Sequence, residues 1–315
     1  NLDVIDVDGA ANFAADVTFA DGADIITASA GTSNFRAGVN AGNSIASGGN
    51  QNTVVGDEAG TALTTGDDNV AVGYAALSTD TLGLKSTAIG RAALASQNFT
   101  SATSTYNTAV GYQAGLAVTT GVRNSLIGGL SGDALTVGSY NVALGYDALS
   151  ADTQGSRNVA IGYGALDDQN FTSATDSYNI GVGFAAGSGI TTGVQNTLIG
   201  GLAGDAITTA SNNTAVGYSA LTANTTGTEN TSTGKGSLQA NTTASYNTAV
   251  GSGALGDTTT GASNTAVGRG ALNKNTTASN NTAVGFDALT ANTTGSVNTA
   301  SGTYALATNT TGASN

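Results

Sequence analysis

The sequence repeats itself every 17 residues, and this short period constrains the fold more than any other feature. From Asn196 onward the string Asn-Thr-x-x-Gly opens every repeat. A unit of this size is expected to stack on its own copies, because one copy cannot bury a core alone. Fifteen repeats open at Asn52, Asn69, Ser86, Asn107, Asn124, Asn141, Asn158, Asn179, Asn196, Asn213, Asn230, Asn247, Asn264, Asn281 and Asn298, and a degenerate one opens at Asn34.

Two aliphatic positions within the repeat exchange with each other. Counted from the opening residue, the ninth position is Leu in ten repeats and Gly in five, and the twelfth position is aliphatic only in those five. Gly132 is thus accompanied by Leu135, whereas Leu221 is accompanied by Asn224. The exchange indicates one interior space per coil that either position fills but both would overpack, at a cost of about 1–3 kcal/mol. A flexible linker would feel no such constraint.

The residue types predict an all-β chain, a parallel β-solenoid (β-roll) of about fifteen 17-residue coils in a homo-oligomeric fibre. Thr-Ala-Val suits one short strand, and the later Ala-Leu pair, as in Ala254-Leu255, suits a second. The invariant fifth-position glycine and a second glycine column near the repeat end indicate bends. The opening Asn is expected to bond to its copies in neighbouring coils.

The boundaries follow from the same pattern. Residues 34–315 are expected to form the solenoid array, which we expect to continue beyond residue 315. Residues 1–33 alternate apolar and acidic residues and are interpreted as a β-rich cap or the end of a preceding module. Asp3, Asp6 and Asp8 fit no known calcium-loop spacing and are interpreted as solvent-facing carboxylates.

The third and fourth repeat positions are both apolar, although neighbouring strand residues point to opposite faces. One of them must therefore point out of the coil, which would leave an exposed apolar stripe along the rod. We expect identical chains to cover it, as an obligate homo-oligomer: a trimer, or a higher ring. The candidate inter-chain ladder comprises Val72, Val110, Val216, Val250, Val267 and Val284.

The motif Asn-Thr-Ala-Val-Gly, with the variants Asn69-Val-Ala-Val-Gly73 and Asn158-Val-Ala-Ile-Gly162, resembles the core repeat of trimeric autotransporter adhesin heads. The resemblance covers residues 52–315 and implies a left-handed parallel β-roll in which three rolls pack together. Similar repeats occur in bacteriophage tail fibres and in bacterial surface-filament proteins. The 17-residue period is longer than the usual repeat of the adhesin family, and neither a heptad stalk nor a membrane anchor is present in this sequence.

Composition excludes several function classes. The chain has no Cys and no His, which excludes Cys/His zinc sites, thiol nucleophiles and Ser-His-Asp triads. Its net charge of −13, with only eight scattered basic residues, argues against nucleic-acid binding. No apolar run is long enough to span a membrane. Asp133 and Asp205 share one column but have no acidic partner in a shared pattern, so no catalytic site, cofactor or metal is predicted.

Two features are candidates for recognition. Both 21-residue repeats carry the insert Gln-Asn-Phe-Thr-Ser-Ala-Thr, and inserts in solenoids bulge from one face. The candidate loop residues are Asn98, Phe99, Thr100, Asn170, Phe171 and Thr172. The sixth position is aromatic in seven repeats and is interpreted as packing between chains or against the next rung rather than as sugar stacking. These aromatics are Tyr74, Tyr112, Tyr146, Tyr163, Phe184, Tyr218 and Phe286.

The function expected from the sequence is mechanical. The chain is interpreted as the shaft or head of an extracellular, adhesive cell-surface fibre, with itself and a cell surface or glycan as partners. A bacteriophage tail-fibre shaft, on a virion, is the first alternative. An ice-binding solenoid is the second, because Thr pairs such as Thr225-Thr226 and Thr276-Thr277 recur near the repeat end. Self-pairing of β-branched Thr between rungs explains the same column without ice.

Overall fold

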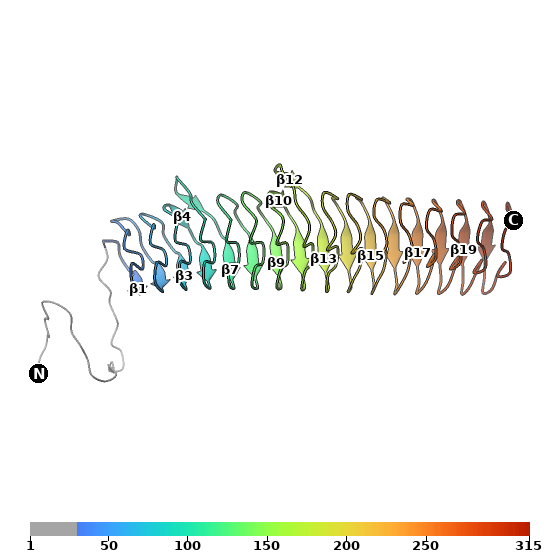
Figure 1. The fold of residues 1–315 in the computed structure, drawn as a ribbon, viewed down its shortest axis with the longest axis horizontal. Helices are drawn as coiled ribbons and strands as arrows, with labels where there is room; N and C mark the ends of the chain where they lie inside the picture. The colour runs from blue at the N-terminus through green and yellow to red at the C-terminus, as the bar shows by residue number, and fades with distance from the viewer. Residues whose placement is uncertain (1–29) are drawn as a thin grey trace, which may run out of the picture.

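The computed structural model describes residues 30–315, which form a parallel β-solenoid. The coils stack side by side along one straight axis, from the N-terminal to the C-terminal end of the array (Figure 1). Each coil contributes one short strand, and successive strands pair in parallel into a 16-stranded sheet. No helix occurs among the described residues. The predicted all-β solenoid is confirmed, with sixteen turns because the degenerate repeat at Asn34 forms the first strand.

The main sheet runs in chain order without crossovers. Its strands are β1 (Phe35–Ala37), β2 (Thr53–Val55), β3 (Val70–Val72), β5 (Thr87–Ile89), β7 (Thr108–Val110), β8 (Ser125–Ile127), β9 (Val142–Leu144), β11 (Val159–Ile161), β13 (Ile180–Val182), β14 (Thr197–Ile199), β15 (Thr214–Val216), β16 (Thr231–Thr233), β17 (Thr248–Val250), β18 (Thr265–Val267), β19 (Thr282–Val284) and β20 (Thr299–Ser301). Two further pairs stand apart from it: β4 (Gly83–Leu84) with β6 (Thr103–Ser104), and β10 (Gly155–Ser156) with β12 (Thr175–Asp176).

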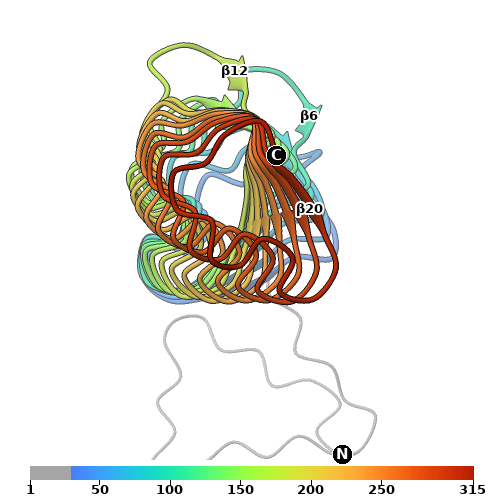
Figure 2. The same ribbon diagram turned by 90° about the vertical axis from the view of Figure 1, so that its right-hand side faces the viewer.

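The register places each repeat position over its own copy. Thr248, Ala249 and Val250 of β17 pair with Thr265, Ala266 and Val267 of β18. The same correspondence holds across the two 21-residue repeats, because the extra residues leave the sheet as loops. Seen along the axis, β6 and β12 project from the same side of the otherwise superimposed coils (Figure 2). Each position of the 17-residue repeat therefore stacks on its own copies as a ladder along the rod.

The third repeat position faces inward and the fourth faces outward, as the strand alternation predicted. Ala215, Ala249 and Ala266 are completely buried, whereas Val250 and Val267 remain 38 % exposed. The interior is thin, so its apolar cluster consists of Ala, Val, Leu and Ile, and the buried polar side chains are mostly Asn and Ser. This arrangement gives the solenoid one continuous core and one continuous outer sheet face.

The prediction of a second strand at the Ala-Leu pair was wrong. Ala254 and Leu255 are both completely buried, which two neighbours in one strand of a thin coil cannot be. Leu255 instead has φ of 50°, in the left-handed region, and belongs to a turn. The bend turns both side chains inward, and it recurs at the ninth position of the other coils. The burial gained by leucine outweighs a conformational cost of about 1–2 kcal/mol.

The opening asparagines form a buried ladder. The backbone N–H of Asn264 donates to Oδ1 of Asn247 at 2.9 Å, and Nδ2 of Asn247 donates to the carbonyl of Gly261 at 2.9 Å. The first contact links neighbouring coils and the second closes a corner within one coil. The predicted contact between stacked asparagines is confirmed, and it extends back to Asn34, whose Oδ1 accepts from the Asn52 N–H.

The exchange between the ninth and twelfth positions also has the predicted steric cause. A Cβ on Gly132 would lie 2.8 Å from Cδ2 of Leu126 and 2.9 Å from Cδ1 of Leu135. Gly204 is in the same position relative to Leu198 and Ile207, each at 2.8 Å. A leucine at either glycine would therefore overpack the coil.

The invariant fifth-position glycine lies at a corner where no side chain fits. Gly251 has φ of 133°, and a Cβ there would lie 2.5 Å from the carbonyl oxygen of Gly268 in the next coil. The expected bend is confirmed, and both positive φ and close backbone approach require glycine here. The predicted cap at residues 1–33, including Asp3, Asp6 and Asp8, lies outside the described residues except for its last four positions.

Candidate functional site

The largest candidate surface is the outer face of the 16-stranded sheet. We define the outer sheet face as the second and fourth repeat positions, which in most coils are Thr and Val or Ile. Leu144 is 45 % exposed and Ile127 is 41 % exposed, and the column continues through most coils. Thr233 and Ser301 interrupt it with small polar side chains. A narrow apolar ladder thus runs along the rod with a Thr-rich column beside it.

All six residues of the predicted inter-chain ladder lie on the outer sheet face. Val250, Val267 and Val284 are exposed. The remaining three, Val72, Val110 and Val216, are half-buried. Each one pairs in the parallel register with the fourth-position residue of a neighbouring coil. A contact between chains stays a prediction.

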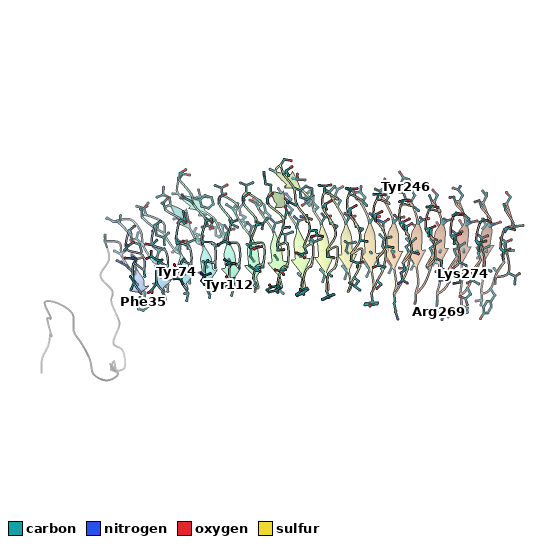
Figure 3. The ribbon with its side chains drawn as sticks, in the orientation of Figure 1. Phe35, Tyr74, Tyr112, Tyr246, Arg269 and Lys274 are labelled. Carbon is teal, nitrogen blue, oxygen red and sulfur yellow. The ribbon has the colours of Figure 1, made fainter. Side chains whose placement is uncertain are left out.

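Aromatic side chains follow the edge of the sheet at the sixth repeat position. Tyr74 and Tyr112 lie where the strand arrows end (Figure 3). Tyr146, Tyr163 and Phe184 stack on consecutive coils, with ring centroids 5.8 Å and 5.5 Å apart. Packing against the next rung therefore accounts for this part of the column. The same rings keep about half of their surface exposed and border the outer sheet face.

The two inserts are anchored by buried acids that the sequence interpretation overlooked. Asp80, in the coil before the first insert, accepts hydrogen bonds from the Gly83 N–H at 3.0 Å and the Phe99 N–H at 3.1 Å. Its second oxygen accepts from Nε2 of Gln97 at 2.6 Å. The second insert repeats the arrangement around Asp152. The sequence signal for this role was an aspartate at the twelfth position of the repeat that precedes each long repeat.

Burial raises the pKa of the Asp80 and Asp152 carboxyls above the ordinary aspartate value. The hydrogen bonds from glutamine and from backbone N–H groups act in the opposite direction but do not cancel the effect. Each carboxylate accepts hydrogen bonds both from its own turn and from the glutamine and phenylalanine of the insert, so it holds the loop to the coil. Their role here is structural.

The predicted loop residues divide into anchors and exposed positions. Phe99 and Phe171 are buried, so their rings fasten the loops rather than face a partner. Thr100 and Thr172 are exposed at the loop tips. Asn98 and Asn170 each accept a hydrogen bond from a Thr of the preceding coil, Thr81 and Thr153 respectively. Recognition by these loops stays a prediction and would depend on the threonines and the residues beside them.

The Thr column proposed for ice binding is largely engaged within the solenoid. Oγ1 of Thr225 donates to the carbonyl of Thr242 at 3.1 Å, and Oγ1 of Thr276 donates to the carbonyl of Thr293 at 3.2 Å. Self-pairing between rungs therefore explains why this position is Thr. The following residues, Thr226 and Thr277, are exposed.

The two acids of the shared column have different surroundings. Burial raises the pKa of Asp133, and the negative charge of Asp147 adds to the effect. Asp205 accepts a hydrogen bond from Oγ1 of Thr222 in the next coil. Within residues 30–315 no group of three or more acidic side chains is arranged to hold a metal ion.

A further column, missed in the sequence analysis, is formed by the last residue of each repeat, directly before the opening residue of the next. In six consecutive coils it reads Lys85, Tyr106, Arg123, Tyr140, Arg157 and Tyr178. Cations and tyrosines alternate, and each cation lies over at least one neighbouring ring. Reading one position down the aligned repeats would have shown it, but the position varies too much within the repeat consensus to attract attention.

The described part of the chain contains no helix long and apolar enough to cross a membrane. Comparison of the chain with known protein families, curated proteins and solved structures found no match.

Proposed function

We propose that this chain is a segment of an extracellular fibre, in which several copies pack side by side through their outer sheet faces. The observation that carries the proposal is the apolar ladder on that face, which runs from Val55 to Val284 and is interrupted only by Thr233 among the described strands. Monomeric soluble proteins rarely expose a contiguous apolar surface of this extent. At about 4.8 Å per strand, the fourteen strands from β2 to β19 make a ladder roughly 65 Å long.

The repeat makes self-association the natural way to cover this ladder. Two identical solenoids have the same step per coil, so parallel chains in register bring every valine against a valine at once. Burying one Val or Ile side chain contributes about 1.5–3 kcal/mol when it starts fully exposed, and less for these half-exposed ones. Summed over the coils, the gain supports an obligate assembly. Closed symmetry with three chains is the arrangement we propose first.

The proposed role of the assembly is mechanical and adhesive. Backbone hydrogen bonds between coils run along the whole rod, and the buried Asn ladder reinforces them. A rod of this kind holds recognition elements away from its base on a cell surface. A bacteriophage tail-fibre shaft would use the same geometry and is the alternative. Both are extracellular.

The test removes the ladder from three neighbouring coils. In the triple variant Val250→Asp, Val267→Asp and Val284→Asp, charges would repel on the outer sheet face. A matched control places the same charges in the same three coils at exposed positions off the sheet: Thr260→Asp, Thr277→Asp and Thr294→Asp. Native mass is measured by light scattering, and circular dichroism verifies the fold.

We expect the unaltered chain to have about three times the 30.4 kDa mass of one chain. The sheet-face variant is expected to lose that assembly, and the control to keep it. A folded monomer would contradict the fibre proposal and favour the ice-binding alternative, whose candidate residues are the Thr pairs near the repeat end. Ice recrystallisation inhibition would then test the ice-binding alternative. An assembly that tolerates both triple variants equally would place the interface elsewhere.

A further inference from the structure

Six consecutive coils carry an alternating row of cations and tyrosines on one corner of the solenoid. We call this the cation–tyrosine row, and its members are Lys85, Tyr106, Arg123, Tyr140, Arg157 and Tyr178. Every member has a positive φ between 51° and 64°, so the backbone turns sharply and the side chain projects outward. Tyr246 occupies the same repeat position farther along and lies near the edge opposite Tyr74 (Figure 3).

The side chains of the row hold one another in place. The Arg123 guanidinium lies 5.2 Å from the Tyr140 ring centroid and that of Arg157 lies 4.9 Å from it, so Tyr140 contacts two cations. Nζ of Lys85 lies 5.2 Å from the Tyr106 ring centroid and donates to its hydroxyl at 3.3 Å. Rings and cations thus stack along the rod, and the order already present lowers the entropy lost on binding a ligand.

The duplicated block of the chain shows that the fold does not need this row. Residues 158–229 repeat the pattern of residues 86–157, including the insert, the core and the strand register. Where the first block has Arg123, Tyr140 and Arg157, the second has Gln195, Asn212 and Glu229. The coils of the second block stack in the same way although they keep only Tyr178 of the row. Its cations and tyrosines are therefore a local surface specialisation.

The row places positive charge on alternate coils of an acidic chain. The net charge is −13, and three of the eight basic residues lie in this single column. Nε of Arg157 is paired with Oδ1 of Asp176 at 3.0 Å. Lys85 and Arg123 make no ion pair among those of the described residues, and they lie two coils apart, at a spacing of about 10 Å.

We propose that the cation–tyrosine row binds an acidic polysaccharide lying along the rod axis. Lys85 and Arg123 would pair with carboxylate groups of the polymer. The hydroxyls of Tyr106 and Tyr140 would donate to sugar oxygens between those groups. The proposal names the ligand class for the adhesive part of the proposed function, on which it rests.

The cation spacing favours this ligand over a nucleic acid. A nucleic-acid strand carries one phosphate about every 3.4 Å, so most of its charges would find no cation and would face an acidic protein. A polysaccharide with one carboxylate per disaccharide has a charge spacing close to two coils. The first insert borders the proposed binding surface at Lys85, because β6 pairs with β4 immediately beside this residue. Exposed pairs of this kind are individually weak, so binding is expected to depend on the repetition of the row in an assembly.

The experiment measures binding of a fluorescent hyaluronan oligosaccharide, which has one carboxylate per disaccharide, to the full chain. The row variant combines Lys85→Gln with Arg123→Gln and Tyr140→Asn, the last two taken from the second block. A control variant, Lys235→Gln with Arg269→Gln, removes the same positive charge from another column. A neutral glucan and single-stranded DNA serve as competing ligands.

We expect salt-sensitive binding of hyaluronan that falls about tenfold or more in the row variant and stays unchanged in the control. Absence of binding by the unaltered chain would overturn the proposal, as would an equal loss in both variants. Tighter binding of DNA than of hyaluronan would also overturn the proposal, because the ligand class would then be a nucleic acid. Native mass, measured on the same samples, separates this inference from the fibre proposal: a monomer that binds hyaluronan would contradict only the fibre.

Discussion

Leu198 fills space for two coils at once, and its removal tests the packing account in depth. It is completely buried at the third position, where most coils have Ala. Positions for a Cβ on Gly187 and on Gly204 lie 2.6 Å and 2.8 Å from its methyl groups. One leucine therefore occupies the volume that ninth-position leucines fill elsewhere. Leu126 plays the same part between Gly115 and Gly132.

The variant Leu198→Ala is expected to lower the local free energy of opening by about 3–5 kcal/mol, the upper part of the range for buried leucines. The upper part applies because the two flanking glycines have no side chains that could relax into the cavity. The variant Gly204→Leu alone is expected to cost about 1–3 kcal/mol through overpacking against Leu198 and Ile207.

The double variant is expected to cost at least about 1 kcal/mol less than the sum, because the new leucine enters the space that Leu198 has left. Leucine at position 204 has the same cost of adopting a left-handed backbone whether position 198 holds leucine or alanine, so this cost cancels from the coupling free energy between the two substitutions. Native-state hydrogen exchange of the Gly187 amide, which donates to the Ala203 carbonyl, reports the local opening. The distant Leu255 amide is the internal control. Additive effects within about 0.5 kcal/mol would refute the shared-volume account.

Three further predictions follow from individual side chains. The Thr258 hydroxyl is buried without a hydrogen-bond partner, so Thr258→Val is expected to stabilise its coil by about 1 kcal/mol. The control Thr276→Val breaks a hydrogen bond to Thr293 and is not expected to stabilise its coil. Hydrogen exchange of the adjacent coils measures the opening free energy of both variants. Asn247→Ala removes the partners of the Asn264 N–H and the Gly261 carbonyl and should cost about 2–4 kcal/mol, and an unchanged opening free energy would contradict the ladder's role. Burial raises the pKa of Asp80 and Asp152, so the folded state binds their protons more tightly than the unfolded chain does. The stability of the insert coils should therefore fall as the pH rises from the ordinary aspartate pKa through the raised one. Hydrogen-exchange protection factors in β17, corrected for intrinsic exchange, serve as the control and should not follow this trend.

Much of the fold could be predicted because the residue pattern within the repeat reflects which positions are buried and how much space the interior has. The alternation of Ala and Val in β15 separates inside from outside, and the Gly–Leu exchange reveals the size of the core. The Ala-Leu turn could not be predicted in the same way. Leucine rarely adopts positive φ, and only the tertiary gain of burying Leu255 in a thin coil makes that conformation favourable.

The candidate surfaces were predictable to different degrees. The outer sheet face follows from strand geometry, because Val250 and Val267 alternate with buried Ala249 and Ala266. The anchoring of Phe99 by Asp80 could not be foreseen, since the carboxylate belongs to the preceding coil and its contact depends on how the insert folds back. The cation–tyrosine row was hidden for a related reason. It exists only between coils, so no single repeat displays it.

The most direct test of the central claim asks whether a residue of the outer sheet face lies beside its own copy in another chain. The chain has no Cys, so Val267→Cys and the control Thr277→Cys each introduce a single thiol. Both side chains are exposed, one on the sheet face and one outside the sheet. A short bifunctional maleimide is applied to each variant at low protein concentration. The account predicts efficient covalent linkage of chains through residue 267 and little through residue 277. Equal yields, or linkage through residue 277 alone, would contradict it.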